Sequence, residues 1–195
     1  MLTIKRGKDK RIVHALLINL ADLPDGVTLS SKDLVKGTPV MEGSVIGRDA
    51  NGVGHLIKTA AVYAAAEASA TSYQIAKGSH FKKGDFVTLN IGGTASAITA
   101  VDRDTSNLYD VITVEATLGS AQPGNVLKEA KAAGSKSEFK NKPEALLAES
   151  YDVEGDTNIF VAAVTIGQFK SALVPAIDAE IKAALTANGS FINFV

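Results

Sequence analysis

Alternating apolar and polar positions run through residues 72–130 and predict a series of short strands. Val87, Leu89 and Ile91 fall on one face of an extended chain, and the residues between them fall on the other. Gly92 and Gly93 follow at once and supply the backbone freedom that a hairpin turn needs. We therefore expect residues 71–130 to form a small all-β module, either a barrel or a sandwich.

The N-terminal region, residues 1–70, reads as β-rich behind an extended arm of about eleven residues. Residues 11–20 are apolar on both faces, which predicts a strand buried on both sides, in a sheet or against a neighbour. Glycine turns before short β-rich runs predict a further β unit over residues 37–59. The alanine-rich segment 59–69 fits a helix or a strand with a linker equally well, and both alternatives stay open.

The C-terminal region, residues 131–195, begins with a segment rich in charged and small residues. Residues 131–149 predict a surface linker with a short helix that begins at Pro143, and residues 158–164 predict a strand. Thr165 and Gln168 resemble a capping box, and Pro175 predicts that the main helix covers residues 175–187. The apolar end, residues 191–195, predicts a terminal strand. The expected fold is mainly β, with small barrel or sandwich units, a C-terminal helix and a terminal strand.

Composition narrows the function classes. The chain has 195 residues, 46% hydrophobic, a net charge of −1 and no cysteine. This charge gives no case for nucleic-acid binding, and the absence of cysteine excludes disulfides and thiolate metal sites. The apolar run 12–20 is too short to span a membrane, and no secretion signal is recognisable, so we expect neither membrane nor nucleic-acid partners. Aromatic residues are sparse, which favours a chain that buries surface against a partner or its own copies.

No set of residues indicates a reaction. His14, His55 and His80 do not have metal-ligand spacing, and residues 102–107 begin like a calcium loop but lack its glycine and its glutamate. A polar turn is the preferred interpretation of that loop, with weak calcium binding as the alternative. Asp85 and Asp110 are the carboxylates that a hydrolase hypothesis would bring together. We expect no catalytic residue, no metal, no cofactor and no enzymatic activity.

Residues 73–130 carry a resemblance to a known family. The segment from Tyr73 to Phe81, the Gly84-Asp85 turn into Phe86-Val87 and the strand 97–102 (AITAVD) resemble the head fiber proteins of tailed bacteriophages and prophages. Residues 109–114 and Leu118-Gly119 continue the likeness. The C-terminal helix and terminal strand are similar to those of capsid-associated phage proteins, and the resemblance is not extended to residues 1–70.

The resemblance implies a non-enzymatic virion protein, made in the bacterial cytoplasm and displayed on the capsid surface. The expected partners are further copies of the chain, as a trimer, and the major capsid protein, with host-surface glycans as a further expected ligand. The apolar stripe and the tail are then the expected oligomer or capsid contacts: Phe169, Leu173, Ile177, Ile181, Leu185, Phe191, Ile192 and Phe194. The alternative is a bacterial carbohydrate- or peptide-binding β module, which the lack of tryptophan disfavours.

Overall fold

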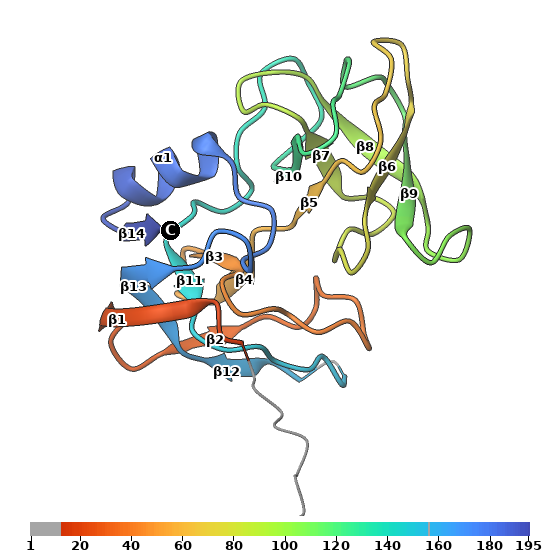
Figure 1. Cartoon of the computed structure of the whole chain (residues 1–195). Helices are drawn as coiled ribbons and strands as arrows, with labels where there is room; N and C mark the ends of the chain where they lie inside the picture. Colours follow the sequence, from red (N-terminus) through yellow and green to blue (C-terminus); the bar gives the residue numbers. More distant parts are fainter. Residues whose placement is uncertain (1–12, 156) are drawn as a thin grey trace, which may run out of the picture.

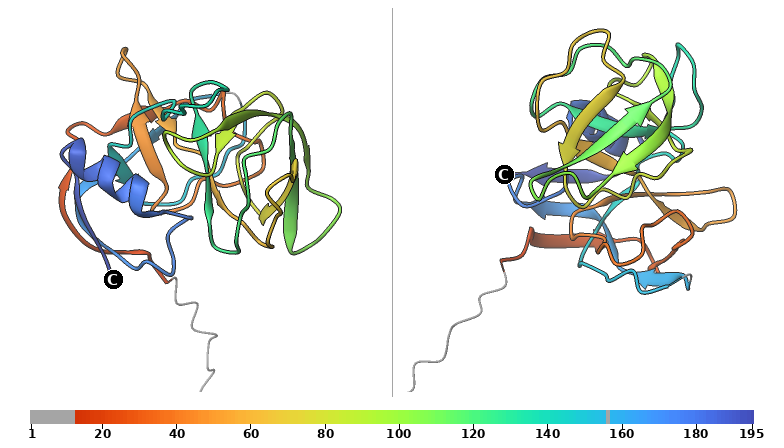
Figure 2. Two further views of the ribbon diagram at one scale, coloured as in Figure 1. Left: turned by 90° about the horizontal axis from the view of Figure 1, so that it is seen from above. Right: turned by 90° about the vertical axis from the view of Figure 1, so that its right-hand side faces the viewer.

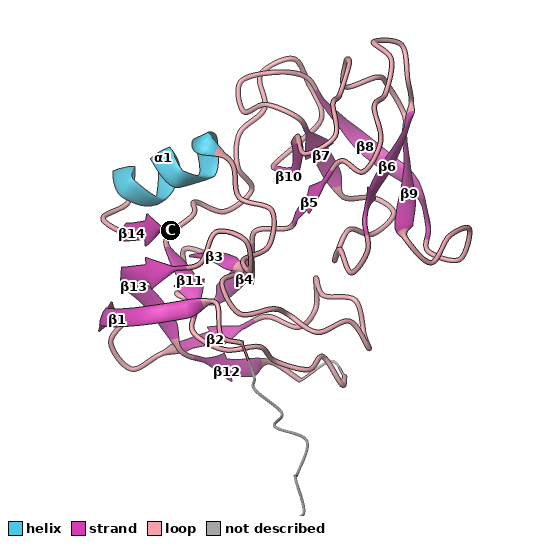
Figure 3. Cartoon of the chain, viewed as in Figure 1, coloured by secondary structure: helices cyan, strands magenta, loops and turns pink. Residues whose placement is uncertain are grey.

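The computed structural model describes residues 13–155 and 157–195, so the predicted N-terminal arm, residues 1–11, lies outside the described residues. The prediction of a mainly β fold with one C-terminal helix and a terminal strand is confirmed (Figures 1 and 3). The strands form two sheets that occupy two halves of the molecule, and the fold is partly barrel-like (Figure 2).

The first sheet has eight strands and takes them from both ends of the chain. Its main path runs β1-β13-β11-β3-β4-β2-β12, and β14 pairs in parallel with β13. Strands from residues 1–70 and from residues 131–195 thus share one sheet. Their bounds are β1 Leu16–Asp22, β2 Val27–Leu29, β3 Val45–Arg48, β4 Gly54–Leu56, β11 Ala145–Leu147, β12 Ile159–Val161, β13 Ala163–Phe169 and β14 Phe191–Phe194.

The second sheet has six strands and contains the module expected over residues 71–130. Its order is β5-β10-β7-β8-β9-β6, and its hairpin between β7 and β8 turns at Asn90–Gly93 as expected, with Gly92 at φ 83°. For the alanine-rich segment 59–69, the sequence left a helix and a strand with a linker as alternatives. The structure shows that it begins with a strand of this sheet and contains no helix. The bounds are β5 Thr59–Ala61, β6 Ser72–Ala76, β7 Phe86–Thr88, β8 Ala95–Asp102, β9 Tyr109–Val114 and β10 Val126–Ala130.

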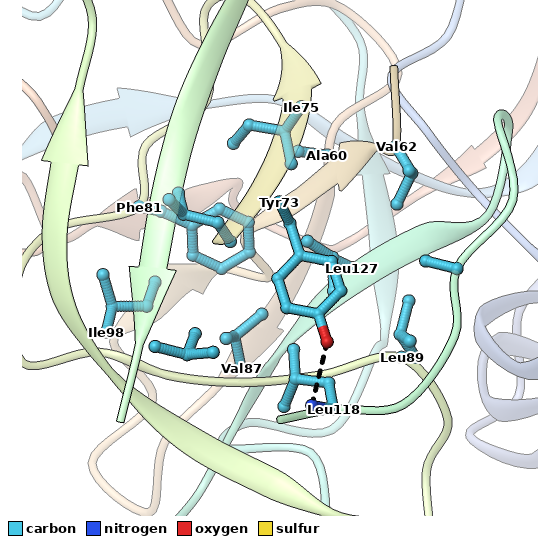
Figure 4. Close-up of a cluster of buried hydrophobic side chains, with 13 residues drawn as sticks. Ala60, Val62, Tyr73, Ile75, Phe81, Val87, Leu89, Ile98, Leu118 and Leu127 are labelled. Atoms are coloured by element: carbon cyan, nitrogen blue, oxygen red, sulfur yellow. Dashed lines mark hydrogen bonds between the residues drawn. The ribbon is translucent and has the colours of Figure 1, made fainter. Parts of the chain in front are cut away.

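Tyr73 lies at the centre of the second sheet's core (Figure 4). Its ring is fully buried with Phe81, Val87 and Leu127. Its hydroxyl accepts a hydrogen bond from the Leu118 backbone N–H at 3.0 Å. The hydroxyl also lies 2.9 Å and 3.0 Å from the carbonyl oxygens of Ala70 and Gly119, so its polar end is satisfied inside an apolar core.

The predicted helix after Pro143 is wrong. Residues 145–147 form β11, a fully buried strand between β13 and β3. Ala145 and Leu147 belong to the core cluster on one side of the sheet, and Leu146 belongs to the cluster shared with the helix. A strand that is apolar on both faces has no polar alternation, so its run of three apolar residues was not distinguishable from a helical turn.

The C-terminal helix α1 covers Ala179–Ala187 and begins four residues after Pro175. Asp178 is its N-cap, because its carboxylate accepts the Ile181 N–H at 3.0 Å. The predicted end is confirmed, since Asn188 is the C-cap and Gly189 follows with φ 90°. The capping box expected at Thr165 and Gln168 is wrong, because both residues lie within β13.

Candidate functional site

An exposed apolar surface lies at the end of the first sheet, on β1 and its neighbours β13 and β14. We call it the edge surface and define it by five side chains: Leu17, Ile18, Leu20, Ile166 and Phe191. Leu20 is 73% exposed and Phe191 is 61% exposed. Ile166 stands opposite Phe191 in the strand register, and Ala21 stands opposite Ile166 on the other side. Val13 and Val195 are also exposed beside these strands.

Among the described residues, strand β1 is an edge of the first sheet, and its strand partner there is β13. It carries one charged residue, Asp22 at its end, and its register with β13 shifts at three places. Edge strands of this kind can pair with another chain, and natural proteins limit such pairing with charges, prolines, bulges or covering elements. Residues 11 and 12 lie outside the described residues. Over residues 13–20 the chain itself does not bury both faces of the strand, and burial against a neighbouring chain stays a prediction. Leu16 packs against a core cluster, but Leu17, Ile18 and Leu20 face water.

The structure separates the predicted contact residues into three groups. Phe169, Ile181 and Leu185 are fully buried in the core cluster that joins β13 to α1. Ile177, Ile192 and Phe194 are half-buried against the same cluster. Leu173 and Phe191 are exposed. Leu17, Ile18 and Leu20 complete the edge surface, although the sequence did not predict them as contact residues. The sequence feature that could have identified them is the apolar run 11–20, which lacks polar alternation.

We expect deletion of residues 191–195 to lower the free energy of unfolding by about 3 kcal/mol, because Ile192 and Phe194 each lose an apolar contact. The loss also removes the parallel pairing of β14 with β13. Urea titration followed by circular dichroism measures the change. Phe191→Ser is the control: this exposed side chain should cost less than about 1 kcal/mol, and an equal loss in both variants would contradict the assignment.

The second feature of interest is the junction between the two sheets. His80, in the loop before β7, is buried against the loop that connects β2 and β3. Its Nδ1 accepts the Val35 N–H at 3.1 Å, so Nε2 carries the proton and donates to the Pro39 carbonyl at 3.2 Å. Burial, helped by the positive charges of Lys58, Arg103 and Lys82, lowers the pKa of His80 to about 4 despite the Pro39 hydrogen bond.

A group of buried charges lies at the same junction. The Lys58 side chain, between β4 and β5, is wholly buried, and its Nζ is 2.7 Å from Asp85 Oδ2 and 3.3 Å from Glu129 Oε1. Glu129 also binds Lys140 at 3.0 Å. Lys140 in turn is 3.9 Å from Asp33. The two sheets are thus connected by a chain of alternating charges rather than by apolar contact alone.

The outer members of this group have shifted pKa values. Burial alone would raise the pKa of Asp33, but the nearby Lys140 and Lys58 charges lower it by more. Burial would lower the pKa of Lys140, but its hydrogen bond and charge pairing with Glu129 raise it above the usual value. Both groups are therefore held in their charged forms at neutral pH.

A second buried lysine lies beside α1. The Lys128 side chain has no exposure, and its Nζ bonds Asp178 and lies 2.7 Å from Glu180 Oε2. The two carboxylates remain 25% and 37% exposed. Asp178 also caps α1, and Glu180 accepts the Ile91 N–H at 2.9 Å. This pairing connects the helix to strand β10 and to the β7–β8 hairpin.

A cavity of about 250 Å³ opens between the two sheets and the loop before α1. Met41 and Leu173 lie in its lining with exposed side chains, and Lys58, Ser79 and His80 lie at its inner wall. Lys58 and His80 already have partners inside the protein. The lining of the cavity is mostly apolar.

The other residues considered for chemistry have structural roles. Asp102 accepts hydrogen bonds from the Thr105 hydroxyl and from the N–H groups of Asp104 and Thr105, and these bonds lower its pKa. The loop is thus a polar turn. Asp85 and Asp110 are each paired with a lysine of their own, Lys58 and Lys77.

Histidines do not gather into a metal site. His14 lies 3.4 Å from Glu42, and His55 lies 3.4 Å from both Asp33 and Asp49. Within residues 13–155 and 157–195, no three potential ligands are arranged to hold a metal ion. In the same ranges no helix is both long enough and apolar enough to cross a membrane. Comparisons with family models, with curated proteins and with solved structures find no match to this chain.

Proposed function

We propose that this chain is a structural protein of a tailed phage or prophage virion, a head fiber or capsid decoration protein displayed on the capsid surface. The observation that carries the proposal is the edge surface, five exposed apolar side chains on β1 and on the paired strands β13 and β14, together with the open edge of β1. The likeness of residues 73–130 to head fiber proteins supplies the biological context. Its partners would be further copies of the chain, as a trimer, and the major capsid protein.

Two physical facts support an assembly role for this surface. Contiguous exposed apolar side chains on a soluble protein mark interaction sites, because leaving them in water costs free energy. An edge strand also offers unpaired N–H and C=O groups that another chain can bind. The core of the second sheet, around Tyr73, is buried within the chain itself. The second sheet is the part that such a protein would display.

The first test replaces an apolar side chain of the edge surface with a charge. Leu20→Asp should convert an oligomer to a monomer, because a buried unpaired carboxylate would oppose subunit contact. Size-exclusion chromatography with light scattering measures the mass, and co-sedimentation with phage heads that lack the protein measures attachment. Leu108→Asp is the matched control, since Leu108 is similarly exposed but lies in the β8–β9 connection.

A wild-type chain that stays monomeric at all concentrations and does not bind heads would contradict the proposal. A monomer that binds glycans would instead support the alternative, a carbohydrate-binding module. The pair Tyr63 and Tyr109, with ring centroids 5.2 Å apart, is the surface that such binding would use, and Tyr63→Ala would abolish it.

A further inference from the structure

Lys58, Asp85 and Glu129 form a triad of reactive groups that the proposed function does not use. The Lys58 side chain is wholly buried, Glu129 is 3% exposed and Asp85 is 14% exposed. Nζ lies 2.7 Å from Asp85 Oδ2 and 3.3 Å from Glu129 Oε1. An amine and a carboxyl group at this distance are within the range of reactive contact, with a second carboxylate beside the amine.

We propose that this triad is a site of covalent self-modification, in which Lys58 Nζ and Asp85 Cγ become joined by an amide bond. Glu129 is the proton carrier of the reaction. The proposal does not depend on the virion assignment, because it rests only on the geometry at the junction of the two sheets.

The atoms of the reaction balance without any other reactant. Glu129 takes a proton from the Lys58 ammonium group and passes it to the Asp85 carboxylate. The lone pair of the neutral Nζ then forms a bond to Cγ of Asp85. A second proton leaves Nζ through Glu129 and joins the departing hydroxyl, and the C–O bond breaks. The products are one amide, which keeps one N–H, and one water molecule.

Burial favours this condensation for two reasons. The amide replaces a cation and an anion that are costly to keep out of water, so the product is better suited to the site than the ion pair. The low exposure of Glu129 and Asp85 also limits access of water, which would attack in the reverse direction. In solution an amine and a carboxylate do not condense, because both stay charged and water is in excess.

The reacting groups are held by the backbone. The Glu129 N–H donates to the Lys58 carbonyl at 2.9 Å, which fixes β10 against the residue that carries the amine. The Lys82 N–H donates to Asp85 Oδ2 at 2.8 Å and is placed to stabilise negative charge on that oxygen as Nζ adds. Lys140 Nζ, 3.0 Å from Glu129 Oε1, holds this carboxylate in position beside the amine.

The Lys128 cluster provides an internal comparison. It has the same three residue types, but its carboxylates, Asp178 and Glu180, are 25% and 37% exposed, so water reaches both. Asp178 is also needed as the cap of α1. We expect Lys128 to stay ion-paired with these carboxylates and to form no amide bond. Lys128→Arg is therefore the matched control for Lys58→Arg.

Intact-mass spectrometry of the folded, purified full chain under denaturing conditions tests the proposal. The wild type should be lighter than its sequence mass by one water molecule, and digestion should give a joined peptide pair that contains Lys58 and Asp85. Lys58→Arg and Asp85→Ala should have their full sequence masses. Glu129→Gln should also have its full mass although both reacting groups are present. Lys128→Arg should still lose one water.

Circular dichroism identifies which variants fold, and the wild-type measurement decides the proposal even if none of them does. A wild-type chain at its full sequence mass after prolonged incubation in the folded state would overturn the proposal. A water loss that maps to Lys128 and Asp178 would overturn it as well. A folded Glu129→Gln variant that is still joined would overturn the role of Glu129.

Discussion

Tyr73→Ala should lower the free energy of unfolding by about 4 kcal/mol, because a fully buried aromatic ring leaves a cavity in the core of the second sheet. Tyr73→Phe should lower it by about 1–3 kcal/mol, since the Leu118 N–H and the carbonyl oxygens of Ala70 and Gly119 then lose a partner inside the protein. Urea denaturation followed by circular dichroism measures both values.

The control for this pair is Tyr63→Ala. Tyr63 is the same residue type on the surface, where it contacts only the ring of Tyr109 among aromatic groups. Its removal should cost less than about 1 kcal/mol. If Tyr73→Phe were as stable as the wild type, the hydroxyl would not be an anchor for the Leu118 turn, and the described hydrogen bonds would carry no net energy.

The second large effect is acid sensitivity of the junction at His80. Its pKa falls from 6.5 to about 4 on folding, so the unfolded chain binds a proton at a higher pH than the folded chain does. The stabilising contribution of neutral His80 is thus fully present above pH 6.5 and is lost as the pH falls towards 4. A shift of this size is equivalent to about 3 kcal/mol.

The comparison of wild type with His80→Asn isolates this contribution, because the other titrating groups are common to both proteins. The difference in unfolding free energy should favour the wild type above pH 6.5 and shrink by about 3 kcal/mol between pH 6.5 and pH 4. The variant is expected to be less stable at neutral pH, since an asparagine side chain is too short to reach both Val35 and Pro39 as His80 does. A difference that stays constant with pH would show that His80 is not held in its neutral form.

The junction links these results to the covalent proposal. Lys58 is one of the charges that lower the pKa of His80, and amide formation with Asp85 would remove that charge. A link between residues 58 and 85 would also close a loop of the second sheet and resist unfolding, by about 3 kcal/mol if it acts as a disulfide of that loop length does. A protein displayed outside a cell or on a particle would gain durability from such a bond.

The sequence pattern correctly predicted those features that depend only on residues close together in the chain. The alternation around Val87, the glycine turn at Gly92 and the end of the helix at Ala187 each depend on residues within a few positions, and each is observed. The terminal strand followed from the cost of leaving residues 191–195 in water, and it is also observed. The failures occurred where a short apolar run fits two structures, as at Leu146, or where a proline was taken as the start of a helix, as at Pro175.

The sequence by itself determined that this chain is mainly β, that its turns fall at particular glycines and that disulfide bonds play no part in it. These properties follow from side-chain periodicity and from backbone freedom, which are local. Only the tertiary structure decided which apolar residues remain in water and which charges become buried together. Leu20 is exposed because no described part of the chain covers its side of β1, and Lys58 meets Asp85 and Glu129 because three separate strand regions converge there. Both outcomes depend on strand order and register between distant segments, and no local pattern encodes them.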